Sequence, residues 1–217
     1  MDGYTRPDFS SVALITIDTQ RDTLDGQLLE ISGTSAILPN MARLLKAFRA
    51  SGRSIIHVVR IYRSGGSNVD PCRRAAVENG CTMFLADSPG AEIAAALLPD
   101  SEIHLDSRRL LSGGIQPLSE HEVVIYKPRW GAFYNTPLQT HLQELGISTL
   151  VFTGCNFPNC PRTSVYEASE RDYRVVLVTD AISGLYRRGA VEMQNIGVAL
   201  CTTDEVLGRI TAAIDEA

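Results

Sequence analysis

The sequence contains little cysteine and no Cys-x-x-Cys motif. Its five cysteines in 217 residues are an odd number, and a chain of this length can fold without covalent cross-links. We therefore expect reduced thiols and not a disulfide framework. The four histidines lie far apart in the sequence, so no ligand set like that of a zinc site is visible. Any reactive thiol must be identified from its surroundings.

Long apolar runs and basic runs are also absent. No apolar stretch approaches the roughly 20 residues of a membrane helix, and residues 1–8 lack the basic and apolar segments of a signal peptide. The 20 Lys and Arg against 25 Asp and Glu give a net charge of −5 without a basic cluster. We expect a cytoplasmic protein that binds a small-molecule substrate and neither nucleic acid nor a membrane.

The composition does provide material for a core. With 44% hydrophobic and 21% charged residues, it is that of an ordinary globular protein, which excludes disorder, collagen and coiled coil. We expect residues 1–217 to form a single domain.

Short apolar runs alternate with amphipathic segments along most of the chain. Runs rich in Val and Ile predict strands at residues 11–18, 54–59, 122–126, 149–153, 174–179 and 198–202. Helical spacing predicts helices at 36–50, 136–145, 160–171, 187–196 and 204–214. This alternation predicts an α/β fold, a parallel sheet with helices on both faces. Between residues 60 and 120 only 91–98 looks helical, and loops of this length are typical of lids, binding segments or oligomer contacts.

Chemically active side chains follow several of the predicted strands. In an open parallel sheet, ligands bind beyond the carboxyl ends of the strands. The first strand ends at Asp18, the strand at 122–126 is followed by Lys127, and Cys160 comes at a helix start after the strand at 149–153. At a helix N-terminus and beside a lysine, the positive electrostatic potential stabilises a thiolate. A carboxylate beside the thiol can accept its proton.

Three segments of the chain carry a family resemblance: IDTQ at 17–20, YKPRWGAF at 126–133 and FTGCNFPNCPRTSVYEASERDYRVVLVTDAISG at 152–184. Together they resemble the isochorismatase-like cysteine hydrolases, which include nicotinamidases, carbamoylsarcosine-type amidases and ureide or biuret hydrolases. The resemblance implies that Cys160 is the nucleophile, Asp18 the general base and Lys127 the cation that holds the thiolate. It also implies a Rossmann-like three-layer α/β/α fold with a six-stranded, mostly parallel sheet.

The same resemblance describes the turn before the nucleophile. It implies a cis peptide bond between Cys155 and Asn156, and an oxyanion hole formed by the backbone N–H groups of Asn156 and Cys160. Family members are commonly oligomeric, so we expect a homo-oligomer.

The chain departs from the family pattern in three places. One is the set of residues around the nucleophile, Cys155, Phe157, Pro158 and Pro161, where small, β-branched or Asp/Asn residues are commoner. Thr23 stands where family members usually carry an aromatic residue, which predicts a more open or more polar pocket wall. The Asp-x-His metal motif of nicotinamidases has no counterpart after the strand at 54–59, so we predict no catalytic metal and no cofactor.

Members that cleave a vinyl ether do not need the thiol, and Cys160 therefore favours acyl transfer at an amide or related C–N bond.

Candidate substrate contacts lie near the same strand ends: Arg60, Tyr62, Trp130, Phe133 and Phe157. The three aromatic residues after Lys127 and before Cys160 are as compatible with core packing as with pocket lining. A charged residue after a strand is often only solvated. Cys155 is interpreted as structural or pocket-lining, and His57 as a hydrogen-bonded core residue.

The sequence thus predicts a metal-independent cysteine hydrolase that cleaves the C–N bond of a small amide, ureide or carbamoyl compound through a thioester. One alternative is vinyl-ether hydrolysis of the isochorismatase type, with Asp18 as the acid and Cys160 as a bystander. Another is a non-catalytic small-molecule binding module. The absence of a glycine-rich phosphate-binding loop after the first strand argues against this alternative. A third is a redox-sensing thiol protein, in which Cys155 would be the resolving cysteine.

Overall fold

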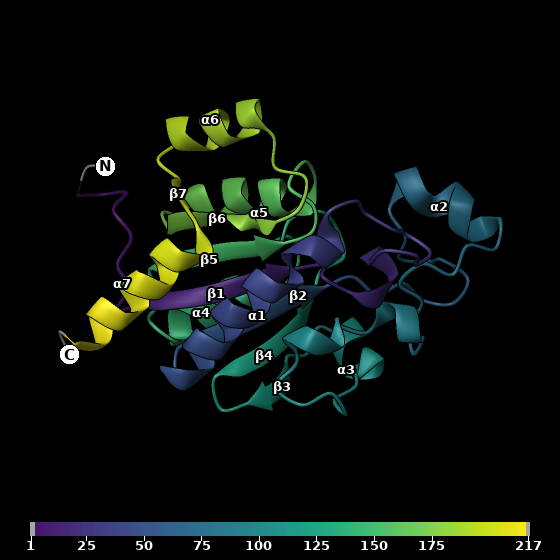
Figure 1. Cartoon of the computed structure of the whole chain (residues 1–217). Helices are drawn as coiled ribbons and strands as arrows, with labels where there is room; N and C mark the ends of the chain where they lie inside the picture. The colour runs from purple at the N-terminus through teal and green to yellow at the C-terminus, as the bar shows by residue number, and fades with distance from the viewer. Residues whose placement is uncertain (1–2, 216–217) are drawn as a thin grey trace.

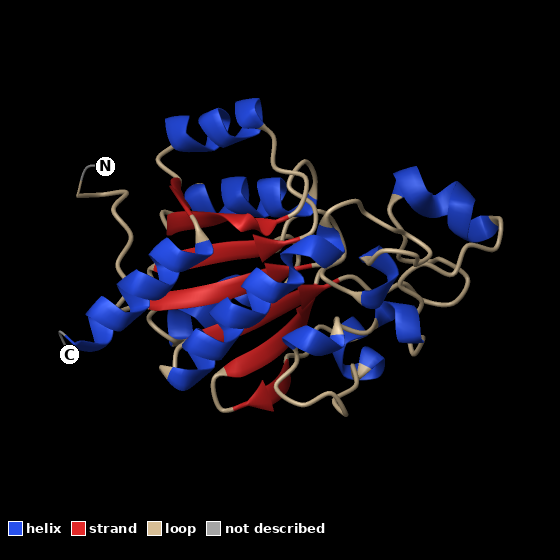
Figure 2. Cartoon of the chain, viewed as in Figure 1, coloured by secondary structure: helices blue, strands red, loops and turns tan. Residues whose placement is uncertain are grey.

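A seven-stranded sheet forms the middle layer of the protein (Figures 1 and 2). The computed structural model describes residues 3–215. The strands are β1 (Val12–Ile17), β2 (Ser54–Val59), β3 (Gln116–Ser119), β4 (Glu122–Tyr126), β5 (Thr149–Gly154), β6 (Arg174–Ile182) and β7 (Ala199–Cys201). Their order across the sheet is β3-β4-β2-β1-β5-β6-β7. Neighbouring strands are parallel except β3 and β4, which are antiparallel.

Helices cover both faces of the sheet. They are α1 (Thr34–Ala50), α2 (Pro71–Glu78), α3 (Ser107–Leu111), α4 (Leu138–Glu144), α5 (Cys160–Ser169), α6 (Arg187–Asn195) and α7 (Thr203–Asp215). Side chains of α1, α3 and α7 pack in one core cluster, and those of α4, α5 and α6 pack in the cluster on the opposite face. No helix of the described chain is both long and apolar enough to cross a membrane.

The central strands are apolar throughout because both of their faces are covered. All six residues of β1 are buried, and Leu14 points into one core cluster while Ala13 and Ile15 point into the other. The arrows of β4, β2, β1 and β5 end on the side where α2 stands, and the two chain termini lie on the opposite side (Figures 1 and 2). α2 has no buried residue, so it projects from the body beside the carboxyl ends of the strands.

The three-layer α/β fold confirms the sequence prediction, and the six predicted strands and five main helices match the observed ones to within three residues at each end. The count of six strands was wrong by one, because β3 is a four-residue antiparallel edge strand that contains Pro117. Such a strand lacks the apolar run that marks a buried one. The sequence also missed α2 and α3, which are short.

The predicted helix at residues 91–98 is wrong. The structure has two 3-10 turns there, Pro89–Ala91 and Ala95–Leu97, joined by extended backbone. The reason is main-chain pairing with the segment after β1: Arg21 donates to the Glu92 carbonyl, and Ala94 donates to the Thr19 carbonyl. Residues held in such a ladder cannot also adopt helical dihedral angles.

A buried polar network crosses three neighbouring strands. The His57 imidazole on β2 contacts the Thr16 hydroxyl on β1 and the Glu122 carboxylate on β4, each at 2.8 Å. Glu122 also accepts two hydrogen bonds from Arg49 of α1. His57 is therefore a hydrogen-bonded core residue, as the sequence predicts. Burial alone would raise the pKa of Glu122, but the hydrogen bonds and charges of Arg49 and His57 lower it to about 2.

The end of β5 passes unusually close to the end of β1. Gly154 has φ = +110°, and a Cβ at this position would lie 2.3 Å from the carbonyl oxygen and 2.7 Å from the backbone nitrogen of Ile17. Only glycine accommodates both this dihedral angle and this approach. Gly154 therefore fixes how the chain after β5 lies beside Asp18.

Replacing Glu122 with Gln should lower the free energy of unfolding by about 1–3 kcal/mol at neutral pH, because a charged acceptor is lost from a buried network. The folded pKa of about 2 lies below the ordinary value of 4.5, so the carboxylate contributes fully above pH 4.5 and loses its contribution as the pH falls toward 2. Urea unfolding at successively lower pH should show the difference from wild type shrinking. Glu120→Gln, at an exposed neighbour, is the control, and a difference independent of pH would contradict the assignment.

Gly154→Ala should destabilise the protein by about 1–3 kcal/mol, because the left-handed backbone becomes strained and the methyl group meets Ile17. Gly208 is a control with the opposite sign. It lies within α7 with no atom within 4 Å of an added Cβ, and Gly208→Ala should stabilise by about 0.5–1 kcal/mol. Thermal or urea unfolding of both variants provides the comparison, and equal effects would argue against the proposed crowding.

Candidate active site

Four adjacent strands bring charged and nucleophilic side chains to one edge of the sheet. Asp18 follows β1, Arg60 follows β2 and Lys127 follows β4, while a short turn leads from β5 to Cys160 at the start of α5. Since β4, β2, β1 and β5 are neighbours in this order, residues far apart in the sequence become close in space. The structure thus groups the Asp, the Lys and the Cys that the sequence singles out.

Asp18 and Lys127 form a buried ion pair. The Lys127 Nζ lies 2.8 Å from Asp18 Oδ2, and the lysine side chain has no exposed surface. Lys127 also donates to the Arg129 carbonyl at 3.2 Å. Asp18 sits in the left-handed region, with φ = +46°, and its N–H donates to the Val58 carbonyl. Among the described residues, Asp18 Oδ1 has no hydrogen-bond partner, so one carboxylate oxygen remains available to accept a proton.

Cys160 is the first residue of α5 and is 4% exposed. Pro161 follows in the first turn, where its missing N–H costs no helical hydrogen bond. Burial raises the pKa of the Cys160 thiol, and so does the charge of Asp18, while Lys127 and Arg60 act in the opposite direction. The raised pKa favours the protonated thiol over the thiolate that a helix N-terminus favours, because desolvation outweighs the cations.

The turn between β5 and α5 presents two backbone donors. The Cys155–Asn156 peptide bond is cis, as the resemblance implies. Within residues 3–215, the backbone hydrogen bonds of this turn come from Cys155, Phe157 and Asn159, and the N–H groups of Asn156 and Cys160 have no backbone acceptor. Two free N–H groups at the start of a helix suit a developing oxyanion.

Arg60 is fully buried beside the thiol. Its Nη1 donates to Asp70 Oδ2 at 2.6 Å and to the Pro128 carbonyl at 3.2 Å. Its Nη2 donates to the Arg129 carbonyl at 2.8 Å and lies 3.8 Å from Cys160 Sγ. Among the groups that surround it, Asp18, Tyr62, Cys160 and Asp70 all raise the pKa of Arg60 and outweigh the effect of burial. This guanidinium is thus a permanent cation at the site.

Tyr62 and Asp70 extend this group toward α2. The Tyr62 hydroxyl donates to Asp70 Oδ2 at 2.6 Å and accepts from Arg73 Nη1 at 3.1 Å. Burial raises the pKa of Tyr62 to about 12. Burial would also raise the pKa of Asp70, but the Arg60 charge and the hydrogen bond from Tyr62 hold it below its ordinary value. Asp70 is therefore the counter-ion of Arg60. Tyr62 contacts Asp70 through its hydroxyl and Arg60 through its ring.

The predicted aromatic contacts divide into two groups. Trp130 is half-buried, with its ring centroid 5.6 Å from the Arg60 guanidinium and 5.0 Å from that of Arg73. Phe133 is 5% exposed and Phe157 is fully buried, and both belong to the core cluster beneath α5. The structure brings Trp130 to the charged group and packs the two phenylalanine rings in the core.

The two phenylalanines pack against aromatic rings outside the charged group. The Phe133 ring lies against Tyr173, with centroids 5.8 Å apart, and the Phe157 ring meets Tyr186 edge-on at 5.5 Å. Cys155 is 2% exposed, and burial raises its pKa to about 11. All five cysteines are free. Cys155 is therefore a structural thiol in this conformation.

Gln20 holds the backbone after β2 in place. Its side-chain amide accepts from the Arg60 N–H and donates to the Arg60 carbonyl, both at 2.8 Å, and also donates to the Ala91 carbonyl. Thr23 is buried, and its hydroxyl donates to the Gln20 carbonyl at 2.7 Å. We predicted a more open or more polar pocket wall at Thr23. In the structure the Thr23 side chain is buried and its hydroxyl is bonded to the backbone.

Sequence reasoning missed three members of this group: Gln20, Asp70 and Arg73. Gln20 lies within the quoted IDTQ segment, so the motif contained a signal for it. Asp70 precedes Pro71, a pair that indicates a helix start but not a charge partner for Arg60. Nothing in the spacing marks Arg73, because α2 is short and has no buried residue. Within residues 3–215, no cluster of His, Cys, Asp or Glu is grouped to hold a metal ion.

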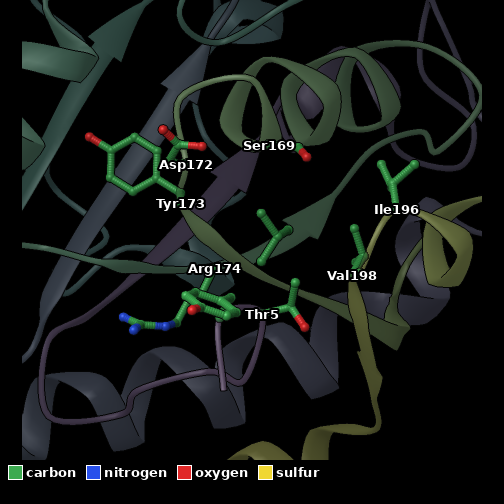
Figure 3. Close-up of a pocket in the computed structure, with 10 residues that line it drawn as sticks. Thr5, Ser169, Asp172, Tyr173, Arg174, Ile196 and Val198 are labelled. Atoms are coloured by element: carbon green, nitrogen blue, oxygen red, sulfur yellow. The ribbon is translucent and has the colours of Figure 1, made fainter. Parts of the chain in front are cut away.

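A separate cavity of about 490 Å³ lies near the amino ends of β6 and β7 (Figure 3). It is lined by Tyr4, Thr5, Ser169, Asp172, Tyr173, Arg174, Val175, Ile196, Gly197 and Val198. In parallel sheets the ligand crevice lies at the carboxyl ends of the strands. This cavity is thus at the opposite edge from Cys160.

Comparison with known proteins gives one consistent result. A family model described as the isochorismatase domain matches residues 12–205. A protein of Arabidopsis thaliana described as a probable inactive nicotinamidase is 29% identical over 201 residues, which are 90% of this chain and 94% of that protein. The ureidoacrylate amidohydrolase RutB of Methylobacterium radiotolerans is 29% identical over 188 residues, covering 80% of this chain and 67% of that protein.

The solved structures agree with the sequence matches. The crystal structure of an isochorismatase family protein from Desulfovibrio vulgaris superposes with a TM-score of 0.77 at 32% identity, covering 91% of this chain and 98% of that chain. The family match spans most of the length, and the fold is shared with a solved relative at this identity. The chain therefore belongs to the isochorismatase family of hydrolases, which confirms the resemblance found in its sequence.

Proposed function

We propose that this hydrolase cleaves the C–N bond of a small amide, ureide or carbamoyl compound through a thioester on Cys160. The observation that carries the proposal is the convergence of a buried Asp18–Lys127 ion pair and the Cys160 thiol at one edge of the sheet. The proposal gains support from the amidohydrolase RutB, a relative whose name describes cleavage of ureidoacrylate.

Acylation needs a base, a nucleophile and an acceptor for negative charge. In the proposed reaction Asp18 takes the proton of the Cys160 thiol, and the sulfur bonds to the carbonyl carbon of the substrate. The N–H groups of Asn156 and Cys160 stabilise the negative charge that develops on the carbonyl oxygen. Asp18 then gives the proton to the substrate nitrogen, the C–N bond breaks, and an amine or ammonia leaves.

Deacylation uses the same groups. Asp18 takes a proton from water, and the water oxygen attacks the thioester carbonyl carbon. The C–S bond breaks, and the proton returns to the sulfur as the acid product leaves. The ammonium group of Lys127 offsets the negative charge of Asp18 and of the sulfur in both halves of the cycle.

We assign the substrate contacts of this proposal to Trp130, Arg73 and Arg129, which lie beside the buried group. Side-chain exposures of 23% for Arg73 and 39% for Arg129 leave both able to reach a ligand. We assign Tyr62 to positioning within the buried group, and Phe133 and Phe157 to packing. Homo-oligomeric assembly and a cytoplasmic location stay predictions.

Cys160→Ala should lower kcat/KM by about 10³-fold or more, because the covalent step is lost. The measurement is ammonia release from a panel of N-carbamoyl amino acids, short primary amides and linear ureides, with unfolding curves to verify the fold. Cys201→Ala, at a buried cysteine on β7, is the matched control and should retain turnover. Full activity of Cys160→Ala would exclude the thioester route and favour ether hydrolysis with Asp18 as the acid.

We expect kcat to fall by about 10²–10⁴-fold in both Asp18→Asn and Lys127→Met. The first substitution removes the proton acceptor, and the second leaves the buried carboxylate of Asp18 unpaired. Lys46, the other lysine of the chain, is exposed on α1, so Lys46→Met controls for loss of a lysine. Steady-state kinetics on the best substrate of the panel test both. Retention of kcat in Lys127→Met with a folded protein would remove the lysine from the mechanism.

A further inference from the structure

Arg60 is an unusual residue to bury. A guanidinium remains charged in proteins and loses its hydration on burial, so it must find acceptors within the fold. Arg60 has no exposed surface, although the sequence suggests a solvated residue after a strand. Its backbone is clamped by Gln20 on both the N–H and the carbonyl side. The chain therefore holds this cation at one position.

The contacts of the guanidinium direct one Nη2 N–H at the sulfur, while Nε has no hydrogen-bond partner among the described residues. Both donors of Nη1 are taken by Asp70 and the Pro128 carbonyl. Of the two donors of Nη2, one goes to the Arg129 carbonyl and the other faces Cys160 Sγ at 3.8 Å. Such a distance suits an N–H group that donates to sulfur.

We propose that Arg60 is a further catalytic residue, which donates a hydrogen bond to Cys160 Sγ and stabilises the thiolate while the thiol proton resides on Asp18. This inference rests on the proposed function. The proton passes from sulfur to Asp18, the negative charge moves from the carboxylate to the sulfur, and no further reactant takes part.

The two cations have different partners before the proton moves. Lys127 Nζ is already paired with the Asp18 carboxylate at 2.8 Å, so its charge offsets that of Asp18 before the proton moves. Arg60 contacts the sulfur directly but shares its charge with Asp70 at 2.6 Å. Removing the charge of Asp70 would leave more of the Arg60 charge for the thiolate. Arg60 and Asp70 should therefore affect Cys160 with opposite signs, which a purely structural role would not produce.

The test is the pH dependence of Cys160 alkylation by iodoacetamide, mapped by peptide mass spectrometry. The charged or titratable groups that act on Cys160 are Asp18, Lys127, Arg60, Cys155 and Arg73. Arg60→Gln should move the midpoint of alkylation up by about 1–3 pH units, because an opposite charge in contact with the thiolate is removed. Asp70→Asn should move the midpoint down.

Two internal controls accompany these variants. Arg63 is an exposed neighbour that donates to the Leu111 carbonyl, and Arg63→Gln should leave the midpoint unchanged. Cys72 is exposed on α2, and its alkylation in the same samples reports on the reagent. Circular dichroism and thermal unfolding show whether each variant is folded.

A folded Arg60→Gln variant with an unchanged midpoint would overturn the proposal, as would upward shifts of similar size in Arg60→Gln and Asp70→Asn. If Arg60→Gln does not fold, the Asp70→Asn variant decides: a lower midpoint supports the role of Arg60, and an unchanged or higher one overturns it. Alkylation needs no substrate, so its outcome is independent of turnover. Unchanged turnover in Cys160→Ala would contradict the proposed function. It would not change the effect of Arg60 and Asp70 on Cys160 alkylation, which is measured without substrate.

Discussion

The buried ion pair between Asp18 and Lys127 is the constraint on which the rest of the site depends. Removing two charges from water costs several kcal/mol per ion unless each finds good partners. The two residues follow strands that are separated by β2, so the pair closes over the end of that strand. Arg60 and Asp70 form a second buried pair beside it. Together the pairs require polar acceptors nearby, and the carbonyl groups of residues 128 and 129 supply them.

The order of the strands explains why the site lies where it does. From β1 the chain adds β2 and β4 on one side of β1, and later returns to place β5 on the other side. Such a reversal leaves a crevice between the two connections at the carboxyl edge of the sheet. Asp18 and Cys160 border this crevice from β1 and β5. Gly154 allows the chain after β5 to pass close to the end of β1.

The electrostatics of the site favour the protonated form of the Cys160 thiol. Burial raises the pKa of Cys160, and the carboxylate beside it acts in the same direction. Two cations oppose this, one of them paired with Asp18 and the other with Asp70. In such a site the proton can move within the group of side chains without a change in the net charge of the group. A buried cluster that keeps its total charge constant avoids the cost of charging a dry interior.

The sequence by itself determined the fold class, the positions of the buried strands and the placement of Asp18, Lys127 and Cys160 after three of them. Apolar periodicity reports burial, and a motif at a strand end is local information. Only the tertiary structure decided the burial and the contacts of Arg60, Asp70 and the aromatic residues. Whether Arg60 is solvated or buried, and whether Phe133 faces a pocket or the core, depends on what packs against it from distant parts of the chain. The contact between the thiol and a guanidinium one hundred residues away exists only because β2 and β5 flank the same strand.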